Sequence, residues 1–299
     1  MYIVIKIKPY FVFAYQMKME LTKKTGLKRS TIDKFYTKAS IVDLCLTQFR
    51  QNVSLQPSDL IIEPSAGNGA FLHKIKLFHT NCIGYDILPD DDAIVKQDYL
   101  AVDSAQIRKS LGSFDKIYVV GNPPFGKQSS LAKKFIQKSA EFCDGIGFIL
   151  PKSFKKESLM KSFPLHFHLL ISIDLPSHSF EVDGKEHDVP CVFQIWTKQS
   201  SERKKQEKVK PTKHYEFVSQ SDTPHFSFRR VGVYAGTLSK DIQNKSVQSH
   251  YFIRLQDATR VEEFYTKYND HVRFDFDNTA GPKSVSKNEL ITQLNLIWV

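Results

Sequence analysis

The sequence contains few cysteines and no long uninterrupted apolar run, and each absence excludes a class of protein. Its four cysteines lie far apart and form no CxxC pair, so the sequence predicts neither a zinc site nor a disulfide framework. The apolar N-terminal stretch MYIVIKIKPYFVFAY is interrupted by Lys6, Lys8 and Pro9. It is too short to span a bilayer and lacks the cleavage site of a signal peptide. We therefore expect reduced thiols, an intracellular location, no metal and no membrane partner.

An excess of charge of one sign is absent from the middle of the chain. The net charge is +10, but residues 31–199 carry nineteen basic and nineteen acidic side chains, so the excess lies in the flanks. Within this neutral part, residues 127–161 hold eight lysines and only three acids. Such a local basic cluster predicts a polyanionic partner, with a solvated helix face as the alternative.

Apolar segments bounded by turn residues recur from residue 60 to residue 200. They alternate with helical patterns at residues 69–78 and 130–142, and a further helical pattern at about 39–49 precedes them. This alternation predicts an α/β fold with a doubly wound, mostly parallel seven-stranded sheet. No helical pattern separates the last two segments, so we expect the last strand to be antiparallel. The predicted strands are residues 60–65, 82–87, 93–100, 116–122, 146–151, 169–176 and 191–198.

Composition divides the chain into four predicted parts. Residues 1–30 form a basic and apolar extension, residues 31–198 the main domain, and residues 199–213 a charged linker almost free of apolar side chains. Residues 214–299 are aromatic-rich, with arginines between the aromatic residues. This C-terminal part predicts either a small second module or additional edges on the main sheet.

A glycine-rich turn, EPSAGNGAF, begins at the end of the first predicted strand. Gly67 and Gly69 can form a tight turn, which lets a ligand approach the backbone at the carboxyl end of the sheet. Asp86 ends the second predicted strand seventeen residues after Gly69. An acid at that position can accept hydrogen bonds from both hydroxyls of a ribose.

Polar residues also end the third and fourth predicted strands. In QDYL, Asp98 can receive an amino group and Tyr99 can cover a flat ring. The fourth strand leads into VVGNPPFGKQ, in which Asn122 is followed by two prolines and Phe125. Asn and Pro are ordinary turn residues, but a second proline and a bulky aromatic residue are unusual in a turn that leads towards water.

These motifs and their order resemble the class I S-adenosylmethionine-dependent methyltransferases that act on the exocyclic amino group of adenine. The resemblance covers about residues 33–198. The order of FYT (35–37), the glycine-rich loop, NPPF (122–125) and a C-terminal region is similar to the gamma arrangement of DNA adenine methyltransferases. It implies a Rossmann-like fold, S-adenosylmethionine as the cofactor and nucleic acid, with DNA favoured, as the partner. We expect the enzyme to be monomeric or weakly associating.

The resemblance also implies a role for each candidate site residue. FYT would pack on the methionine part of the cofactor, while Asp86 and Asp98 would contact its ribose and adenine. The implied cofactor-binding residues are Phe35, Tyr36, Thr37, Glu63, Pro64, Ala66, Gly67, Gly69, Phe71, Asp86, Asp98 and Tyr99. The implied catalytic residues are Asn122, Pro123, Pro124 and Phe125. Candidate substrate contacts are Lys127, Phe180, Arg229 and Arg230, with a core position for Phe180 and an internal salt bridge for the arginines as open alternatives.

The chemistry of amino methylation explains why NPPF would suit it. The adenine amino nitrogen is a poor nucleophile because its lone pair is delocalised into the ring. If the side-chain oxygen of Asn122 and the backbone carbonyl of Pro123 each accept one of its hydrogens, the lone pair is directed out of the ring plane. The prolines restrict the backbone and donate no competing hydrogen bonds, and Phe125 would stack on the target base.

Other substrates remain open at this point. Amino-methyltransferases for cytosine usually begin the tetrapeptide with Ser, so Asn122 favours adenine. Glutamine methyltransferases of release factors share Asn-Pro-Pro and an aromatic residue, but EPSAGNGAF differs from their usual glycine loop. RNA is an alternative polymer, because a single strand presents an unpaired adenine at lower cost. A catalytically silent nucleic-acid-binding protein of the same fold is the non-enzymatic alternative.

Overall fold

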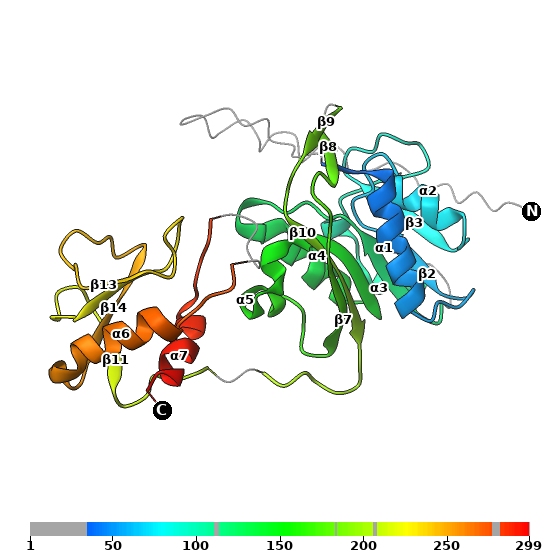
Figure 1. Cartoon of the computed structure of the whole chain (residues 1–299). Coiled ribbons are helices and arrows are strands. Elements are labelled where there is room, and N and C mark those ends of the chain that lie inside the picture. Colours follow the sequence, from blue (N-terminus) through cyan, green and yellow to red (C-terminus); the bar gives the residue numbers. More distant parts are fainter. Residues whose placement is uncertain (1–34, 111–113, 183, 206–207, 277–281, 299) are drawn as a thin grey trace, which may run out of the picture. The chain divides into compact units, whose positions relative to one another are not determined.

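The computed structural model describes residues 35–110, 114–182, 184–205, 208–276 and 282–298 (Figure 1). The predicted N-terminal extension, residues 1–30, lies outside these residues and stays a prediction. Within the described ranges, no helix is both long enough and apolar enough to cross a membrane.

A seven-stranded sheet forms the main domain. Its strand order is β4-β3-β2-β5-β6-β10-β7, with β10 antiparallel to both of its neighbours and the other pairs parallel. The predicted doubly wound α/β fold and the antiparallel last strand are therefore confirmed. The strands are β2 (Leu60–Glu63), β3 (Cys82–Asp86), β4 (Val95–Lys96), β5 (Ile117–Gly121), β6 (Gly145–Pro151), β7 (Phe167–Asp174) and β10 (Cys191–Lys198).

Helices cover both faces of this sheet, and neighbouring strand residues pack on opposite sides. Ile62 belongs to the same apolar cluster as Ile136 of α4, whereas Ile61 belongs to the cluster that contains Phe49 of α1 and Ile75 of α2. Burial on both faces explains why these strands are continuously apolar rather than alternating. The helices of this domain are α1 (Ala39–Asn52), α2 (Ala70–Lys76), α3 (Ser104–Ser110), α4 (Ser130–Ala140) and α5 (Glu157–Met160).

A small three-stranded sheet connects two distant segments of the main domain. The strand β1 (Tyr36–Thr37) pairs with β8 (Phe180–Val182), which forms a hairpin with β9 (Lys185–His187). Thr37 lies opposite Phe180 in this pairing. The predicted FYT segment is thus held at a fixed place by residues more than 140 positions later in the sequence.

The C-terminal part forms a separate sheet rather than extra edges on the seven-stranded one. Its four strands are antiparallel in the order β11-β14-β12-β13. Tyr215, Ile253, Phe264 and Leu290 belong to its own apolar core. The elements are β11 (Tyr215–Val218), β12 (Phe226–Arg229), β13 (Leu238–Ser239), β14 (His250–Leu255), α6 (Val261–His271) and α7 (Lys287–Leu296). We call this part the C-terminal module.

The charged segment 199–213 contacts folded structure near both of its ends. The backbone N–H of Arg203 donates to the carbonyl of Leu165 at 2.8 Å, and its guanidinium lies 5.1 Å from the ring centre of Trp196. Further on, the backbone N–H of Val209 donates to the side chain of Asn288 at 3.1 Å. The segment therefore has fixed attachments on either side of its middle.

Candidate active site

The glycine-rich loop adopts a backbone that only glycine accepts easily. Gly67 and Gly69 have φ angles of 52° and 79°, in the left-handed region. A Cβ atom on Gly69 would lie 2.5 Å from the ring of His73, and one on Gly67 would lie 3.5 Å from the ring of Tyr36. The loop thus needs glycine at both positions for its conformation, while the exposed His73 ring could move away from a Cβ at residue 69.

Asp86 holds this loop at the carboxyl end of β3. Its Oδ2 accepts a hydrogen bond from the backbone N–H of Gly67 at 2.8 Å, and its Oδ1 accepts one from the N–H of Leu88 at 2.8 Å. A carboxylate has about four acceptor sites, so these two bonds leave capacity for the hydroxyls of a ribose. The partly buried position of Asp86 is compatible with such a ligand.

Two apolar side chains next to Asp86 were not predicted as site residues. Ile87 is 65% exposed and Leu88 is 46% exposed. An apolar pair directly after a strand-end acid could be found in the sequence, and it would offer a surface for a flat ring bound beside the ribose. Exposed large apolar side chains that cluster on a surface often mark a binding site.

The FYT segment lies against the glycine-rich loop. The hydroxyl of Tyr36 donates to Oδ2 of Asp90 at 2.6 Å, and the backbone N–H of Asp90 donates to the carbonyl of Gly67 at 2.9 Å. The structure therefore brings together three segments that the sequence separates by up to 54 positions. Asp90 was not singled out in the sequence, because its role depends on this long-range contact.

Glu63 connects the end of β2 to the first turn of α2. Its side chain is buried, and Oε2 accepts from the backbone N–H of Leu72 at 2.7 Å. Burial raises the pKa of Glu63 well above its usual range, and the opposing effect of the hydrogen bonds from Leu72 and Phe71 is smaller. Glu63 therefore fixes the glycine-rich loop through its bond to α2. A second bond fixes the loop to β3, because the backbone N–H of buried Ala66 donates to the carbonyl of Tyr85 at 2.9 Å.

Asn122 is held by the FYT segment on one side of its amide. Nδ2 donates to Oγ1 of Thr37 at 3.2 Å and lies 3.5 Å from the carbonyl oxygen of Phe35. Because that carbonyl can only accept, the amide nitrogen must face it. The hydroxyl of Ser65 in the glycine-rich loop donates to the backbone carbonyl of Asn122 at 3.0 Å. NPPF is thus bonded to both predicted cofactor segments.

The other side of the Asn122 amide has no hydrogen-bond partner among the residues that the structure describes. Oδ1 is buried and accepts no hydrogen bond from any residue that the structure describes. A buried acceptor without a donor is costly, by roughly 1–3 kcal/mol, and such groups are rare in native proteins. This oxygen is therefore available to a donor that belongs to a ligand.

The residues that follow Asn122 hold NPPF between the apolar clusters on the two faces of the sheet. Pro123 is buried, and Phe125 is partly buried and packs against the apolar clusters on both faces of the sheet. The carbonyl of Phe125 accepts from the backbone N–H groups of Leu131 at 3.1 Å and Ala132 at 3.3 Å. The first turn of α4 thereby anchors the loop.

The turn between NPPF and α4 is strained. Gly126 has a φ of 68°, and the non-glycine residues Gln128 and Ser129 have φ angles of 52° and 58°. Each non-glycine residue in this region costs of order 1–3 kcal/mol, and such residues cluster at functional sites. The exposed Gln128 is therefore a further candidate residue of the active site. The sequence alone does not indicate it.

Several predicted site residues lie in positions with other roles. The Tyr99 ring is only 1% exposed and stacks on Phe135 with centroids 5.5 Å apart, so it packs in the core instead of covering a bound ring. The predicted strand 93–100 is also too long, because Asp98 accepts from the backbone N–H of Leu100 at 2.9 Å and begins a 3₁₀ turn at Tyr99–Ala101. Asp98 is exposed and stays a candidate.

Two predicted phenylalanines are core residues by burial. Phe71 and Phe180 are each 1% exposed and belong to one apolar cluster. Phe180 packs edge to face against Phe35, with ring centroids 6.3 Å apart. The alternative of a core position for Phe180 is therefore the one that the structure supports, and Phe71 supports the loop through packing.

The predicted arginine contacts are used inside the C-terminal module. Arg229 Nε donates to the carbonyl of Val231 at 2.9 Å, and Arg230 donates twice to the carbonyl of Gln248, at 3.0 and 2.8 Å. These are hydrogen bonds to backbone oxygens, not the internal salt bridge that was the alternative. Both guanidinium groups thus stabilise turns of the module.

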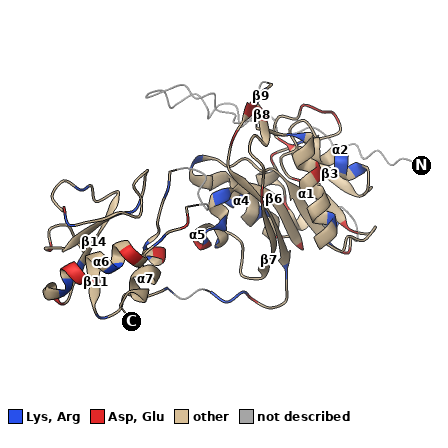
Figure 2. Ribbon diagram, viewed as in Figure 1, with Lys and Arg blue, Asp and Glu red and all other residues tan. Residues whose placement is uncertain are grey.

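Basic residues lie along α4, and an acidic residue lies in the first turn of α5 (Figure 2). The lysines of residues 127–161 differ in whether an acid neutralises them. Lys138 pairs with Glu141, Lys161 with Glu157, and both Lys152 and Lys155 with Asp174. Burial raises the pKa of Asp174, but the hydrogen bonds and charges of these two lysines outweigh it and lower the pKa. Lys127, Lys133 and Lys134 form no ion pair with the described residues.

No group of three or more His, Cys, Asp or Glu residues that could hold a metal ion occurs in the described part of the chain. No protein family model and no curated protein matches the chain. Solved structures match it at low identity. A protein of Pyrococcus horikoshii assigned as an RNA methyltransferase is 16% identical, with a TM-score of 0.40 over 59% of this chain and 93% of its own.

Other solved structures extend the range of functions that share this likeness. The M protein of the type I restriction enzyme EcoKI is 14% identical, with a TM-score of 0.38 over 57% of this chain and 45% of its own. A Lactococcus lactis protein assigned as a hemolysin is 10% identical, with a TM-score of 0.40 over 57% of this chain and 92% of its own. Identities this low concern the fold alone, so any activity must be argued from the residues of the site.

Proposed function

We propose that the protein transfers a methyl group from S-adenosylmethionine to the N6 amino group of adenine in DNA. The observation that carries the proposal is the buried Oδ1 of Asn122, which accepts no hydrogen bond from the described residues. The backbone of Asn122 is bonded to Ser65 of the glycine-rich loop. An adenine amino group has two hydrogens to donate. One of them would satisfy an acceptor that the described residues leave without a donor.

The residues around the glycine-rich loop fit S-adenosylmethionine. Asp86 has free acceptor capacity for the ribose hydroxyls, and Ile87 offers exposed apolar surface beside it. The positive φ angles of Gly67 and Gly69 give the loop its tight turn, and the rings of Tyr36 and His73 lie beside it. When bound, this cofactor supplies a methyl group on a positively charged sulfur.

The role of the protein in the transfer is to orient and polarise the amino group. Oδ1 of Asn122 would accept one amino hydrogen and the carbonyl of Pro123 the other, which directs the nitrogen lone pair away from the adenine ring. Both acceptors interact more strongly as positive charge develops on the nitrogen, so they stabilise the transition state more than the bound substrate. Thr37 is a positioning residue, because its hydroxyl accepts from the Asn122 amide at 3.2 Å.

The same chemistry on RNA is the second candidate. The observation that favours it is the aromatic and basic surface of the C-terminal module, where Lys287 lies 4.2 Å from the ring centre of Phe217. Aromatic rings next to cations suit unpaired bases, which RNA presents without duplex opening. A glutamine of a protein would also offer an amino group to Asn122, but it offers no ring for Phe125 to stack on.

The test is methyl transfer from isotope-labelled S-adenosylmethionine to separate pools of DNA and RNA, followed by nucleoside analysis. We expect labelled N6-methyladenosine in its deoxy form, from the DNA pool. Label in the RNA pool alone would replace the substrate with RNA. Calorimetric titration with S-adenosylmethionine is the companion measurement. A protein that does not bind the cofactor and does not transfer label would be the silent nucleic-acid-binding alternative.

A further inference from the structure

An open pocket of about 400 Å³ lies in the C-terminal module. Its walls come from the end of β11 and the turn after it, from the start of β14 and the residues before it, and from the first residue of α7. The side chains that matter for its chemistry are Phe217, Gln220, Val247, His250, Tyr251 and Lys287. The catalytic proposal above uses none of these side chains.

Aromatic rings and a cation meet in this pocket. The rings of Phe217 and Tyr251 lie edge to face with centroids 5.9 Å apart, and both are only partly buried. Lys287 Nζ lies 4.2 Å from the centre of the Phe217 ring, and the Arg230 guanidinium lies 5.6 Å from that of Tyr251. No acidic residue is among the described residues that line the pocket. A ligand with a flat ring and negative charge fits these walls.

Lys287 differs from a comparable lysine elsewhere in the module. Lys240 also lies over an aromatic ring, 4.8 Å from the centre of Tyr265, but its ammonium pairs with Glu262. Lys287 forms no ion pair with any residue in the described ranges. Its charge is therefore available to an anion, whereas that of Lys240 is matched within the protein.

His250 supplies a directed polar group. Nδ1 lies 3.0 Å from the carbonyl oxygen of Ser246 and 3.0 Å from the hydroxyl of Ser249. Because the carbonyl only accepts, Nδ1 carries the proton, and Nε2 is then an acceptor in the neutral ring. Burial lowers the pKa of His250, aided by the charges of Arg229 and Lys245 and opposed by the bond to Ser246, so the neutral ring is favoured at pH 7.

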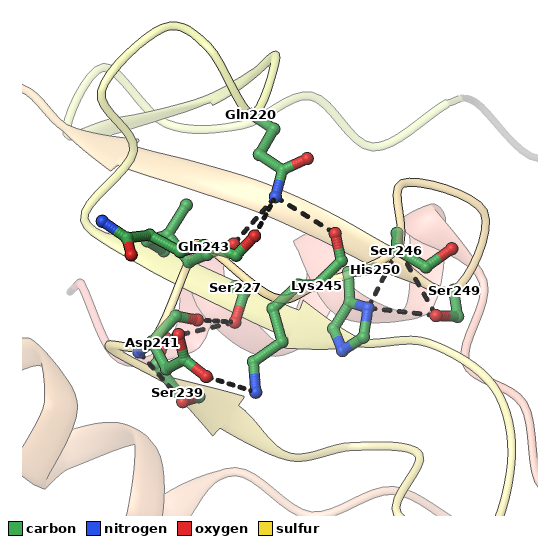
Figure 3. Close-up of polar contacts among 10 residues, drawn as sticks. Gln220, Ser227, Ser239, Asp241, Gln243, Lys245, Ser246, Ser249 and His250 are labelled. Atoms are coloured by element: carbon green, nitrogen blue, oxygen red, sulfur yellow. Dashed lines mark hydrogen bonds and ion pairs between the residues drawn. The ribbon is translucent and has the colours of Figure 1, made fainter.

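A network of hydrogen bonds fixes the loop that carries Val247 (Figure 3). The Gln220 side-chain amide donates to the carbonyls of Ile242 at 2.8 Å and Lys245 at 3.1 Å. The buried hydroxyl of Ser227 donates to the carbonyl of Asp241 at 2.7 Å. The pocket wall is therefore held in place before a ligand arrives, which reduces the entropy lost on binding.

We propose that this pocket binds an unpaired nucleotide of the nucleic acid on which the chain acts. The base would stack on the face of one of the two rings, Phe217 or Tyr251, and meet the edge of the other. It would donate to Nε2 of His250, and its phosphate would lie near Lys287. The proposal rests on the proposed function for the identity of the ligand. Nucleic acid is favoured over a free nucleotide because the pocket is open, so the chain on either side of the bound nucleotide can leave it.

The experiment measures binding of the full-length protein to short single-stranded DNA and RNA oligonucleotides by fluorescence anisotropy. Lys287→Ala and Phe217→Leu should each raise Kd by roughly fivefold to a hundredfold, the range that follows from the loss of stacking and charge at one base. Lys240→Ala is the matched control and should stay within about twofold of the parent, since it removes a lysine over a ring outside the pocket. Lys287 is exposed, so its variant remains informative if Phe217→Leu is poorly folded.

The outcomes separate this site from the catalytic one. Equal Kd values for the parent and for Lys287→Ala would overturn the pocket proposal, as would adenosine monophosphate binding as tightly as the oligonucleotide. A Kd that rises in Lys287→Ala but not in Lys240→Ala, with unchanged S-adenosylmethionine affinity, would support it. If the parent transfers no methyl group yet shows this pattern, the proposed function fails while the nucleotide site stands.

Discussion

The side-chain amide of Asn122 donates to the hydroxyl of Thr37 at 3.2 Å, across 85 positions of sequence. This bond decides which way the amide points, and it leaves Oδ1 buried without a donor from the described residues. The small sheet in which Thr37 pairs with Phe180 holds Thr37 in turn. The proposed catalytic acceptor is thus oriented by the strand β1, which itself pairs with the distant strand β8.

The first prediction concerns Asn122→Ala, which should nearly abolish methyl transfer and leave the cofactor bound. The variant removes an acceptor whose interaction strengthens in the transition state, and loss of one such group costs on the order of a hundredfold or more in kcat. Single-turnover rates and calorimetric titration with S-adenosylmethionine measure the two effects separately.

Asn122→Asp is the companion variant and should retain appreciable activity. Asp keeps the acceptor oxygen, and the Thr37 hydroxyl can turn to donate to it, since a hydroxyl is both donor and acceptor. One carboxylate oxygen of Asp would replace the amide nitrogen, which lies 3.5 Å from the Phe35 carbonyl oxygen, and the two oxygens would repel each other. Equal inactivity of the Ala and Asp variants with intact cofactor affinity, or full activity of the Ala variant, would remove Asn122 from its role.

The second prediction is that Asp86→Ala weakens S-adenosylmethionine binding by roughly 1–3 kcal/mol, because ribose hydroxyls would lose their acceptor. The variant also frees the backbone N–H of Gly67, which Asp86 holds at 2.8 Å. Asp92→Ala is the control, since Asp92 is an exposed acid and its removal changes the net charge equally. Equal affinity of both variants in a calorimetric titration would place the ribose elsewhere.

The third prediction uses the difference between paired and unpaired lysines in residues 127–161. Replacement of Lys127, Lys133 and Lys134 by Gln should flatten the dependence of the logarithm of the binding constant on the logarithm of salt concentration. Each phosphate that the protein then fails to neutralise changes that slope by roughly 0.7 for single strands and 0.9 for duplex DNA. The same substitution at Lys138, Lys155 and Lys161, which are paired with acids, should change it less. The reverse order would mean that the unpaired lysines lie away from the nucleic acid.

The fourth prediction concerns the buried carboxyl of Glu63, whose pKa is raised in the folded protein by burial. Between the usual value of 4.5 and the raised one, the folded state holds more protons than the unfolded state. As pH rises above 4.5, Glu63 ionises in the unfolded state while it stays protonated in the folded state. This difference lowers the free energy of unfolding by at most about 1.4 kcal/mol per pH unit. Glu63→Gln cannot ionise and can still accept from the N–H of Leu72.

Urea unfolding of the parent and of Glu63→Gln over a series of pH values tests this sign. The difference in unfolding free energy should shift in favour of the variant as pH rises from about 4.5. All other groups titrate in both proteins, so their contributions cancel in the difference. Parallel stability curves would mean that Glu63 has the same pKa in the folded and unfolded states.

The fold was predictable because its signals are local. The central parallel strands β2, β5 and β6 are buried throughout, so each is a short continuous apolar run in the sequence. Asp86 is recognisable as the polar residue that ends the neighbouring strand β3. The helical patterns between the runs fixed the alternation, and their absence before residue 191 indicated the antiparallel strand. These features depend on neighbours within about ten residues and can be read without the tertiary structure.

The errors arose where a role depends on distant contacts. Residues 93–100 were predicted as one strand, but only Val95–Lys96 form it. The Asp98 side chain bonds to the backbone of Leu100 and turns the chain, and Phe135 of a later helix covers Tyr99. Arg229 and Arg230 also donate to backbone carbonyls of the C-terminal module, and their contact with phosphate stays a prediction. The partner of the Asn122 amide lies 85 positions away, and no spacing in the sequence reveals it.

The last prediction concerns Gln128, whose left-handed backbone follows NPPF with a φ of 52°. Gln128→Gly relieves strain of order 1–3 kcal/mol and adds the entropy cost of glycine, roughly 0.5–1 kcal/mol. The variant should therefore be as stable as the parent or more stable, by up to about 2 kcal/mol. Its methyl transfer should nevertheless be several-fold slower, because a more flexible turn holds Phe125 and Asn122 less firmly.

Thr223→Gly is the matched control for this variant. Thr223 has a φ of 49° and lies in the turn before β12 of the C-terminal module, so its replacement relieves the same kind of strain in a turn that the catalytic proposal does not use. The same turn also contributes to the pocket proposed for an unpaired nucleotide, so rates are compared at saturating nucleic acid. Thr223→Gly should raise the free energy of unfolding in urea and leave kcat for methyl transfer unchanged. A Gln128→Gly variant that is clearly less stable would show that the backbone there is not strained. One that is stable and fully active would show that the strain at Gln128 has no part in positioning NPPF.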